Sequence, residues 1–93
     1  MQVYYFNSFL RSFRKLSRQQ QDNVSEAMAD FVSCLENKNT IPQGMGLKKL
    51  TAYLWEIRSG IDLRIVLTTD SDVLNFVFTG NHDEIRKYIR HNK

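Results

Sequence analysis

A histidine ends the last apolar stretch of the chain, where "FVFTGNHDEI" places His82 just past a glycine. Cationic residues come before it: Arg58 and Arg64 flank a short turn sequence, and Lys48 and Lys49 stand side by side. This set suits metal-free RNA cleavage, in which the ribose 2′-OH attacks its own phosphate and the 5′-oxygen leaves. The protein then only has to orient the phosphate, offset its charge and move protons.

Other site chemistries lack their residues. Cys34, His82 and His91 are the only cysteine and histidines, and they cannot supply the four ligands of a tetrahedral zinc site. Asp70 and Asp72 fit a turn better than a metal site. The "GMG" segment lacks the strand, helix and later glycine of a phosphate-binding loop. We therefore expect no metal and no cofactor. A histidine after Gly-Asn could also serve simply as a helix-cap or turn residue.

Length and composition limit the kind of protein. A chain of 93 residues, 42% of them hydrophobic, suffices for one core and not for two, so we take residues 1–93 as a single domain. One cysteine cannot form an internal disulfide, which fits a reducing, cytoplasmic setting. No segment reaches the roughly 18 apolar residues of a membrane span. The net charge of +3 is a mild bias toward polyanions, and solvated charge without a partner remains an alternative.

The first half of the chain predicts a strand followed by two helices. The segment "VYYF" (residues 3–6) is β-prone, and the apolar residues after it keep helical spacing as far as Leu16. A second helix fits residues 18–36, because Ser17 and Gln20 have the spacing of a capping box. The next segment holds the only proline and two of the four glycines, which indicates a loop.

The second half predicts three strands in a meander, over residues 52–58, 63–69 and 73–79, joined by short turn sequences. Asn81 and Glu84 can then cap a short C-terminal helix. The expected fold class is α+β: a small, mostly antiparallel four-stranded sheet with an N-terminal α-hairpin packed on one face and a short C-terminal helix. We expect the other face of the sheet to stay open.

The open, charged face of this sheet is the predicted location of the site. Alternation places Trp55 and Ile57 on one side of the strand over residues 52–58, with Glu56 and Arg58 on the other. Whether Arg58 and Arg64 share a face depends on the hairpin register, because a slip of one residue reverses it. The two arginines could also be surface charges without a task.

The second half of the chain resembles the C-terminal half of the RelE/ParE superfamily of bacterial toxins. "TGNH" is similar to the Thr-Gly-X-His ending of the last strand in YafQ-like toxins, and "LWEIRSGIDLRIVL" is similar to the paired central strands of the family. The first half agrees in the order of its elements. The resemblance implies a RelE/ParE-like, microbial RNase-like fold, and the activity of the YafQ-like and RelE-like ribosome-dependent mRNA endonucleases.

The resemblance also implies roles for residues around "TGNH". His82 is similar to the general acid that protonates the leaving 5′-oxygen, and Arg64 is similar to the arginine that binds the scissile phosphate. Arg58 stands where family members carry an arginine or histidine in the cleavage site. Asp62 resembles a carboxylate used by YafQ-like members, although it could simply serve the hairpin turn.

Further residues follow from the same resemblance. Lys48 and Lys49 match a loop in which RelE-like members carry lysines for base abstraction or charge stabilisation. Tyr88 aligns with a C-terminal catalytic tyrosine, yet its spacing from two isoleucines also fits a packing role. Arg86 replaces an aromatic residue that YafQ-like members use for stacking, so a contact with phosphate is its expected role.

The function implied is that of the toxin of a type II toxin–antitoxin system, a metal-independent endoribonuclease that cuts mRNA in the ribosomal A site and inhibits translation. Its expected partners are a cognate antitoxin, mRNA and the ribosome, and not a membrane. One alternative is a ParE-like toxin that inhibits DNA gyrase without cutting RNA, although "TGNH" counts against that branch. Another is a non-catalytic nucleic-acid-binding module.

Overall fold

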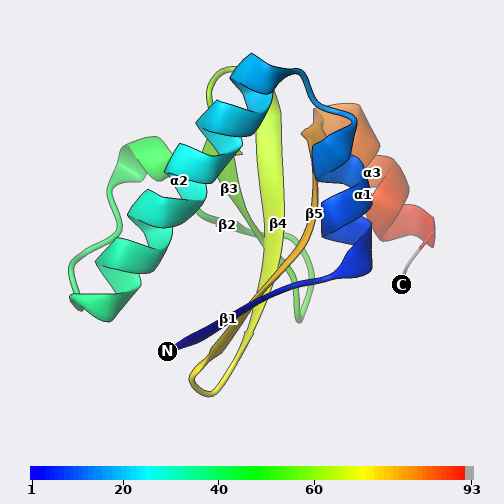
Figure 1. Cartoon of the computed structure of the whole chain (residues 1–93). Helices are drawn as coiled ribbons and strands as arrows, with labels where there is room; N and C mark the ends of the chain where they lie inside the picture. The colour runs from blue at the N-terminus through cyan, green and yellow to red at the C-terminus, as the bar shows by residue number, and fades with distance from the viewer. Residues whose placement is uncertain (92–93) are drawn as a thin grey trace.

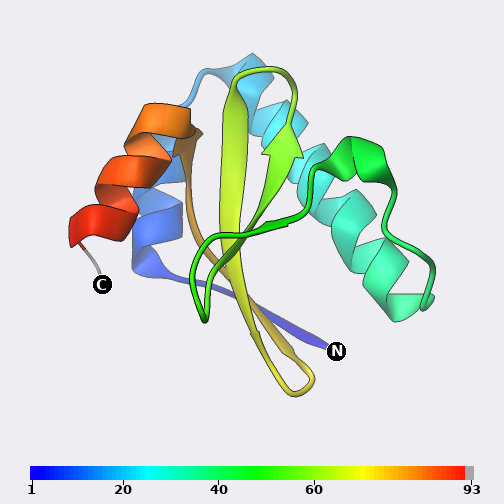
Figure 2. The ribbon, with the colours of Figure 1, turned by 180° about the vertical axis from the view of Figure 1, so that it is seen from behind.

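Two helices cover one face of a twisted five-stranded sheet (Figure 1), and a third helix lies against the other face (Figure 2). This computed structural model describes residues 1–91. The elements are β1 (Gln2–Tyr5), α1 (Asn7–Arg14), α2 (Arg18–Glu36), the 3-10 helix η1 (Gln43–Met45), β2 (Lys48–Lys49), β3 (Trp55–Ser59), β4 (Leu63–Asp70), β5 (Val73–Asn81) and α3 (His82–His91). None of the helices in this part of the chain is long and apolar enough to cross a bilayer.

The sheet has the strand order β1-β5-β4-β3-β2 and is mixed. The α+β class is confirmed, but the prediction of four strands is wrong, because β2 adds a fifth. Its two residues are both lysines, so no apolar alternation marks it in the sequence. The hairpins make their strands antiparallel, whereas β1 runs parallel to β5. No tight turn joins β1 to β5, so nothing forces that pair to be antiparallel.

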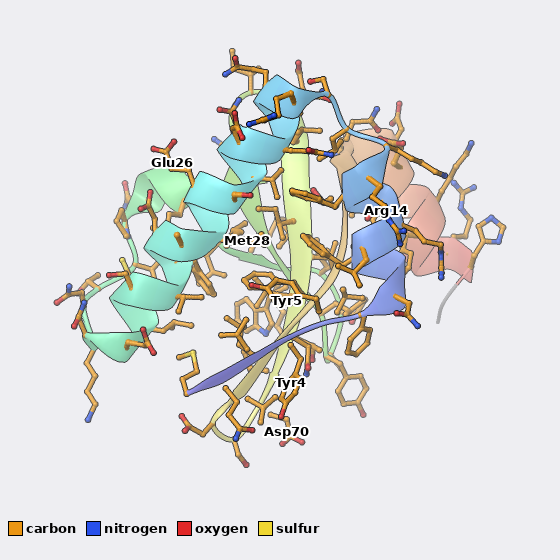
Figure 3. All side chains as sticks on the ribbon, in the orientation of Figure 1. Tyr4, Tyr5, Arg14, Glu26, Met28 and Asp70 are labelled. Carbon is orange, nitrogen blue, oxygen red and sulfur yellow. The ribbon has the colours of Figure 1, made fainter. Side chains whose placement is uncertain are left out.

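The main core lies between the sheet and the α1–α2 hairpin, as expected. Buried side chains from both helices pack on buried residues of β3, β4 and β5. Figure 3 shows Met28 of α2 pointing toward the sheet and Glu26 pointing away from it. The helix α2 begins where the sequence predicts, because Ser17 and Gln20 form both hydrogen bonds of a capping box.

A second, smaller core lies under α3 on the opposite face. Val66 and Val77 from the sheet pack with Ile85 of α3, and partly buried apolar residues surround them. The predicted cap of α3 is present, since the Asn81 N–H donates to Glu84 Oε1 at 2.9 Å and the Glu84 N–H donates to Asn81 Oδ1 at 2.8 Å. The face predicted to be open is therefore partly covered by α3 (Figure 2).

The strand predicted from residue 52 begins only at Trp55. Before it, the Thr51 hydroxyl accepts hydrogen bonds from the N–H groups of Tyr53 and Leu54, at 3.2 and 3.1 Å. The Leu50 N–H donates to the Leu54 carbonyl at 2.8 Å and closes the turn. A threonine that bonds the backbone in this way competes with a strand and favours a turn. The result is the tight β2–β3 hairpin.

Candidate functional site

Arg58 and Arg64 lie directly opposite each other in the β3–β4 pairing, and Gly80 of β5 lies opposite Arg64. Residues opposite each other across neighbouring strands share a face of the sheet. The register that the sequence left open therefore places both arginines on the face that α3 partly covers. Because like charges directly opposite destabilise a sheet, this arrangement calls for a compensating group.

That group is Glu56, which is diagonal to Arg64 on the same face. Arg64 Nε lies 3.3 Å from Glu56 Oε2, and the two side chains are only 20% and 10% exposed. A charge this far out of water is tolerated when it is paired. Arg64 Nη1 also donates to the carbonyl of Leu63 at 3.4 Å. The guanidinium of Arg64 is thus held on the sheet by two contacts.

Arg58 is positioned by a glycine on the neighbouring segment. Gly46 has φ of 62°, and a Cβ atom built there would lie 3.2 Å from both Cβ and Nε of Arg58. The exposed Arg58 side chain therefore packs on bare backbone of the loop before β2. A residue with a side chain at this position would be strained and would also push the arginine away.

A β-bulge at Val77 sets which way the end of β5 faces. Val66 pairs with Phe78, whereas Leu67 pairs with Phe76, so Val77 is the extra residue. Beyond the bulge, Thr79 faces α1, where its N–H donates to Ser12 Oγ at 3.1 Å. Its hydroxyl donates to the Arg64 carbonyl at 2.9 Å. Gly80, the next residue, then lies on the arginine face, in the row of Arg58 and Arg64.

His82 is the first residue of α3, and its side chain is exposed. The Asn81–Glu84 cap fixes the start of this helix. Gly80 allows the helix to turn back closely over the sheet, because a Cβ there would lie 3.0 Å from Cβ and Oε1 of Glu84. The position of His82 thus depends on a buried glycine and on a cap immediately beside it.

A cleft of about 850 Å³ lies between α1, the β3–β4 turn and the start of α3. Four of the predicted site residues line it: Asp62, Arg64, His82 and Tyr88. Its volume is within the usual range of small-molecule sites. The structure thus brings a histidine, an arginine and a carboxylate together around one hollow.

The other predicted site residues lie outside this cleft. Arg58 is the cross-strand neighbour of Arg64, and Lys48 lies opposite Glu56 at the sheet edge. Lys49 is opposite Trp55, with its Nζ 5.7 Å from the centre of that indole ring. Alternation therefore places Lys49 on the face covered by α1 and α2. Arg86 is exposed on α3 and does not line the cleft.

Tyr88 and Asp62 each retain two predicted roles. The Tyr88 ring stacks on Phe78 with centroids 4.6 Å apart and an interplanar angle of 17°, and it packs against the second core. It nevertheless lines the cleft. Asp62 is exposed in the β3–β4 turn and also lines the cleft. Within residues 1–91, no group of three His, Cys, Asp or Glu residues could hold a metal ion.

Two residues around the site, Glu56 and Gly46, have no role predicted from the sequence. Glu56 was placed on the face of Arg58, but its partner depends on the hairpin register. Gly46 was counted only as a loop residue. Arg11 and Lys15, by contrast, belong to a basic cluster in the sequence of the kind that can form a phosphate-binding surface, and both line the cleft.

Comparison with solved structures identifies the fold. A copper-bound mutant toxin from Helicobacter pylori superposes with a TM-score of 0.75 at 19% identity, over 91% of this chain and 98% of that one. The chain has the fold of the YafQ- and RelE-type toxins. YafQ from Escherichia coli gives a TM-score of 0.68 at 14% identity, over 89% of this chain and 94% of YafQ.

A RelE-type toxin shares the fold as well. In the RelB–RelE antitoxin–toxin complex from Methanococcus jannaschii, the matched chain gives a TM-score of 0.69 at 18% identity, over 92% of this chain and 98% of that one. No protein-family model and no curated protein sequence matches the chain. The resemblance to YafQ- and RelE-like toxins is thus confirmed for the fold, and identities this low leave function to be argued from the site.

Proposed function

We propose that this chain is the toxin of a type II toxin–antitoxin system and that it cleaves mRNA at the ribosome, in the cytoplasm, without a metal. One observation carries the proposal: His82, Arg64 and Asp62 line the same cleft, with Arg58 directly beside Arg64. These are the residue types that phosphodiester cleavage by the substrate's own 2′-OH requires. The shared fold with YafQ and RelE supports the same assignment.

The proposed reaction needs two proton transfers and positive groups that stabilise the negative charge of the transition state. Asp62 accepts the proton of the 2′-OH, whose oxygen attacks the adjacent phosphorus. The bond from phosphorus to the 5′-oxygen breaks, and His82 in its imidazolium form gives its proton to that oxygen. The products are a 2′,3′-cyclic phosphate and a 5′-hydroxyl end. Arg64 and Arg58 stabilise the charge of the pentacoordinate transition state.

Histidine suits this role because it exists in both protonation states near neutral pH. The exposed position of His82 at the mouth of the cleft allows a large substrate to reach it. The fixed Arg64 supplies a rigid contact for the scissile phosphate, because its ion pair with Glu56 restricts its rotamers. Arg58 is the freer of the two and can follow the phosphate as charge develops.

A protein partner is part of the proposal. The solved neighbours include the DinJ–YafQ and RelB–RelE complexes, in which a toxin of this fold is bound by an antitoxin. This chain exposes large apolar side chains along β1 and at the start of α1, with Tyr4 and Tyr5 on opposite sides of the strand: Tyr4, Tyr5, Phe6 and Leu10. An edge strand with exposed apolar side chains, such as β1, is typical of a protein-binding surface. We propose that a cognate antitoxin covers it and blocks the activity.

The decisive experiment is brief expression of the chain in growing cells, with the 5′ ends of cellular RNA mapped before and after induction. We expect growth arrest and new mRNA ends that carry a 5′-hydroxyl group. Replacing the general acid by His82→Gln should lower the cleavage rate about 10²- to 10⁴-fold. His91→Gln is the matched control, because His91 lies at the other end of the same helix and does not line the cleft.

Other results would contradict the proposal in distinct ways. DNA damage signalling without new mRNA ends would identify a gyrase poison. RNA binding in cells without growth arrest would identify a non-catalytic module. Equal cleavage by His82→Gln and the wild type would remove the histidine from the reaction. Co-expression of the antitoxin, taken as the product of the neighbouring gene, should abolish the arrest.

A further inference from the structure

One side of α1 forms a wall of the cleft. Its lining residues recur at helical spacing, three of them on α1 and two in the turn that directly follows it: Ser8, Arg11 and Ser12, then Lys15 and Leu16. The two serines fix the helix against β5. The Ser8 hydroxyl donates to the Val77 carbonyl at 2.5 Å, and the Ser12 hydroxyl accepts from the Thr79 N–H at 3.1 Å. Arg11 is therefore carried by a helix that is anchored to the strand ending at the site, and Lys15 is carried by the C-cap of that helix.

Arg11 and Lys15 line the cleft as exposed cations. Among residues 1–91, neither of them forms an ion pair. They lie one turn apart on the same side, where like charges repel each other weakly. A favourable interaction with the helix C-terminus would explain cations here in general. The helix dipole would not explain why Arg11 and Lys15 both line the cleft. Arg14 (labelled in Figure 3) is close to the same helix end and does not line the cleft.

The remaining charges of the cleft are partly engaged within the protein. Arg64 is paired with Glu56. Three carboxylates line the cleft, Asp62, Asp83 and Glu84, and that of Glu84 accepts the hydrogen bond from the Asn81 N–H. A second phosphate near the site would meet repulsion on the side of Asp62 and Asp83. The α1 wall is the side on which it would meet cations without partners.

We propose that Arg11 and Lys15 form a second phosphate-binding subsite, which holds the RNA backbone at a phosphate next to the scissile one. The ligand is single-stranded RNA, and the strand passes from the arginine face of the sheet along the α1 wall of the cleft. The location of this subsite rests on the proposed function, because that function defines which phosphate is the scissile one. The subsite contributes binding and alignment, and it takes no part in proton transfer.

The salt dependence of RNA binding tests this directly. The probe is a short polyuridine oligonucleotide with 2′-O-methyl riboses and a fluorescein label, which this chemistry cannot cleave. Fluorescence anisotropy gives its dissociation constant over a series of potassium chloride concentrations. Each phosphate contact on a single strand contributes about 0.7 to the slope of log K against log salt. Because Arg11 and Lys15 together hold one phosphate, the double variant Arg11→Gln, Lys15→Gln should flatten the slope by about 0.7 and weaken binding at low salt.

The matched control removes two charges nearby that do not line the cleft, by Arg14→Gln with Arg18→Gln. This control should keep the wild-type slope. An equal loss in both double variants would overturn the subsite, because it would show a general effect of charge. An unchanged slope in the Arg11, Lys15 variant, or no binding of the probe by the wild type, would overturn it as well.

Failure of the subsite and failure of the proposed function are distinguishable. The probe reports binding alone, and mapping of RNA ends reports cleavage. A wild type that cuts mRNA, combined with no slope change in the Arg11, Lys15 variant, rejects only the subsite. A slope change in a protein that never cuts RNA supports the subsite and rejects the nuclease. Circular dichroism checks that the variants remain folded, which we expect because Arg11 and Lys15 are exposed.

Discussion

Arg64 and Glu56 form a largely buried ion pair, with 3.3 Å between Nε and Oε2, on the face of the sheet that carries the cleft. Glu56 lies between Arg64 and the edge strand β2, since it is also directly opposite Lys48. The position of Arg64, the proposed phosphate-binding residue, therefore depends on the pairing of β3 with β4. Stability and activity should respond together when it is broken.

The first prediction concerns this pair. Glu56→Gln should lower the free energy of unfolding by about 1–3 kcal/mol, because it leaves Arg64 half-buried without an anionic partner. Urea denaturation of Glu56→Gln, Arg64→Gln and the double variant forms a complete cycle. The double variant should lose less than the sum of the singles, with a coupling of about 0.5–3 kcal/mol. Strict additivity would mean that the pair does not hold Arg64 in solution.

The second prediction concerns the glycine under Arg58. Gly46→Ala and Gly60→Ala should cost similar stability, about 1–2 kcal/mol each, because both glycines have positive φ, 62° and 65°. Only the alanine at 46 would contact Arg58, since nothing lies within 4 Å of a Cβ at 60. RNA cleavage should therefore fall about tenfold or more in Gly46→Ala alone. Equal cleavage by the two variants would show that Arg58 needs no such support.

The third prediction concerns the start of α3. Gly80→Ala would place Cβ 3.0 Å from two atoms of Glu84 and 3.2 Å from the Phe78 ring, so we expect a loss of about 1–3 kcal/mol. Displacing the first turn of α3 should also reduce cleavage through His82. Gly44→Ala is the control, because nothing lies within 4 Å of its Cβ and its φ is not positive. A Gly80→Ala protein as stable as Gly44→Ala would contradict the close approach.

The fourth prediction separates packing from catalysis at Tyr88. Tyr88→Phe keeps the ring that stacks on Phe78 and removes only the hydroxyl, so it should be more stable than a variant that lacks the ring. Tyr88→Ala removes the ring and should cost about 1–3 kcal/mol. Thermal unfolding and single-turnover cleavage measure the two effects. A loss in Tyr88→Phe as large as that in His82→Gln would make the hydroxyl a catalytic group.

Features that depend on neighbouring residues were predictable from the sequence. The bounds of α2 follow from the Ser17–Gln20 capping box and a long apolar stripe, and the cap of α3 follows from Asn81 and Glu84. Both signals span three residues of chain, so they need no knowledge of the fold. Features that depend on pairing between distant segments were not predictable in this way.

The bulge at Val77 is one such feature. It reverses the alternation along β5 and so decides which way Thr79 and Gly80 face, and nothing in "VLNFVFTGN" marks it. The two-residue strand β2 is another, because the partner strand alone makes it a strand. The contribution of Arg11 and Lys15 to the cleft also required the structure. Helical spacing places them on one side, and only the packing of α1 on β5 determines which side that is.

The parallel pair of β1 and β5 joins segments about as far apart in the chain as this fold allows, with Gln2 opposite Val73 and Tyr5 opposite Phe76. During synthesis, β1 therefore has no partner strand until β5 has been made. Contacts between segments this far apart in the sequence slow folding. His82 follows directly at the end of that same late strand. A nascent chain released before residue 82 lacks both the complete sheet and the imidazole on which the proposed cleavage depends.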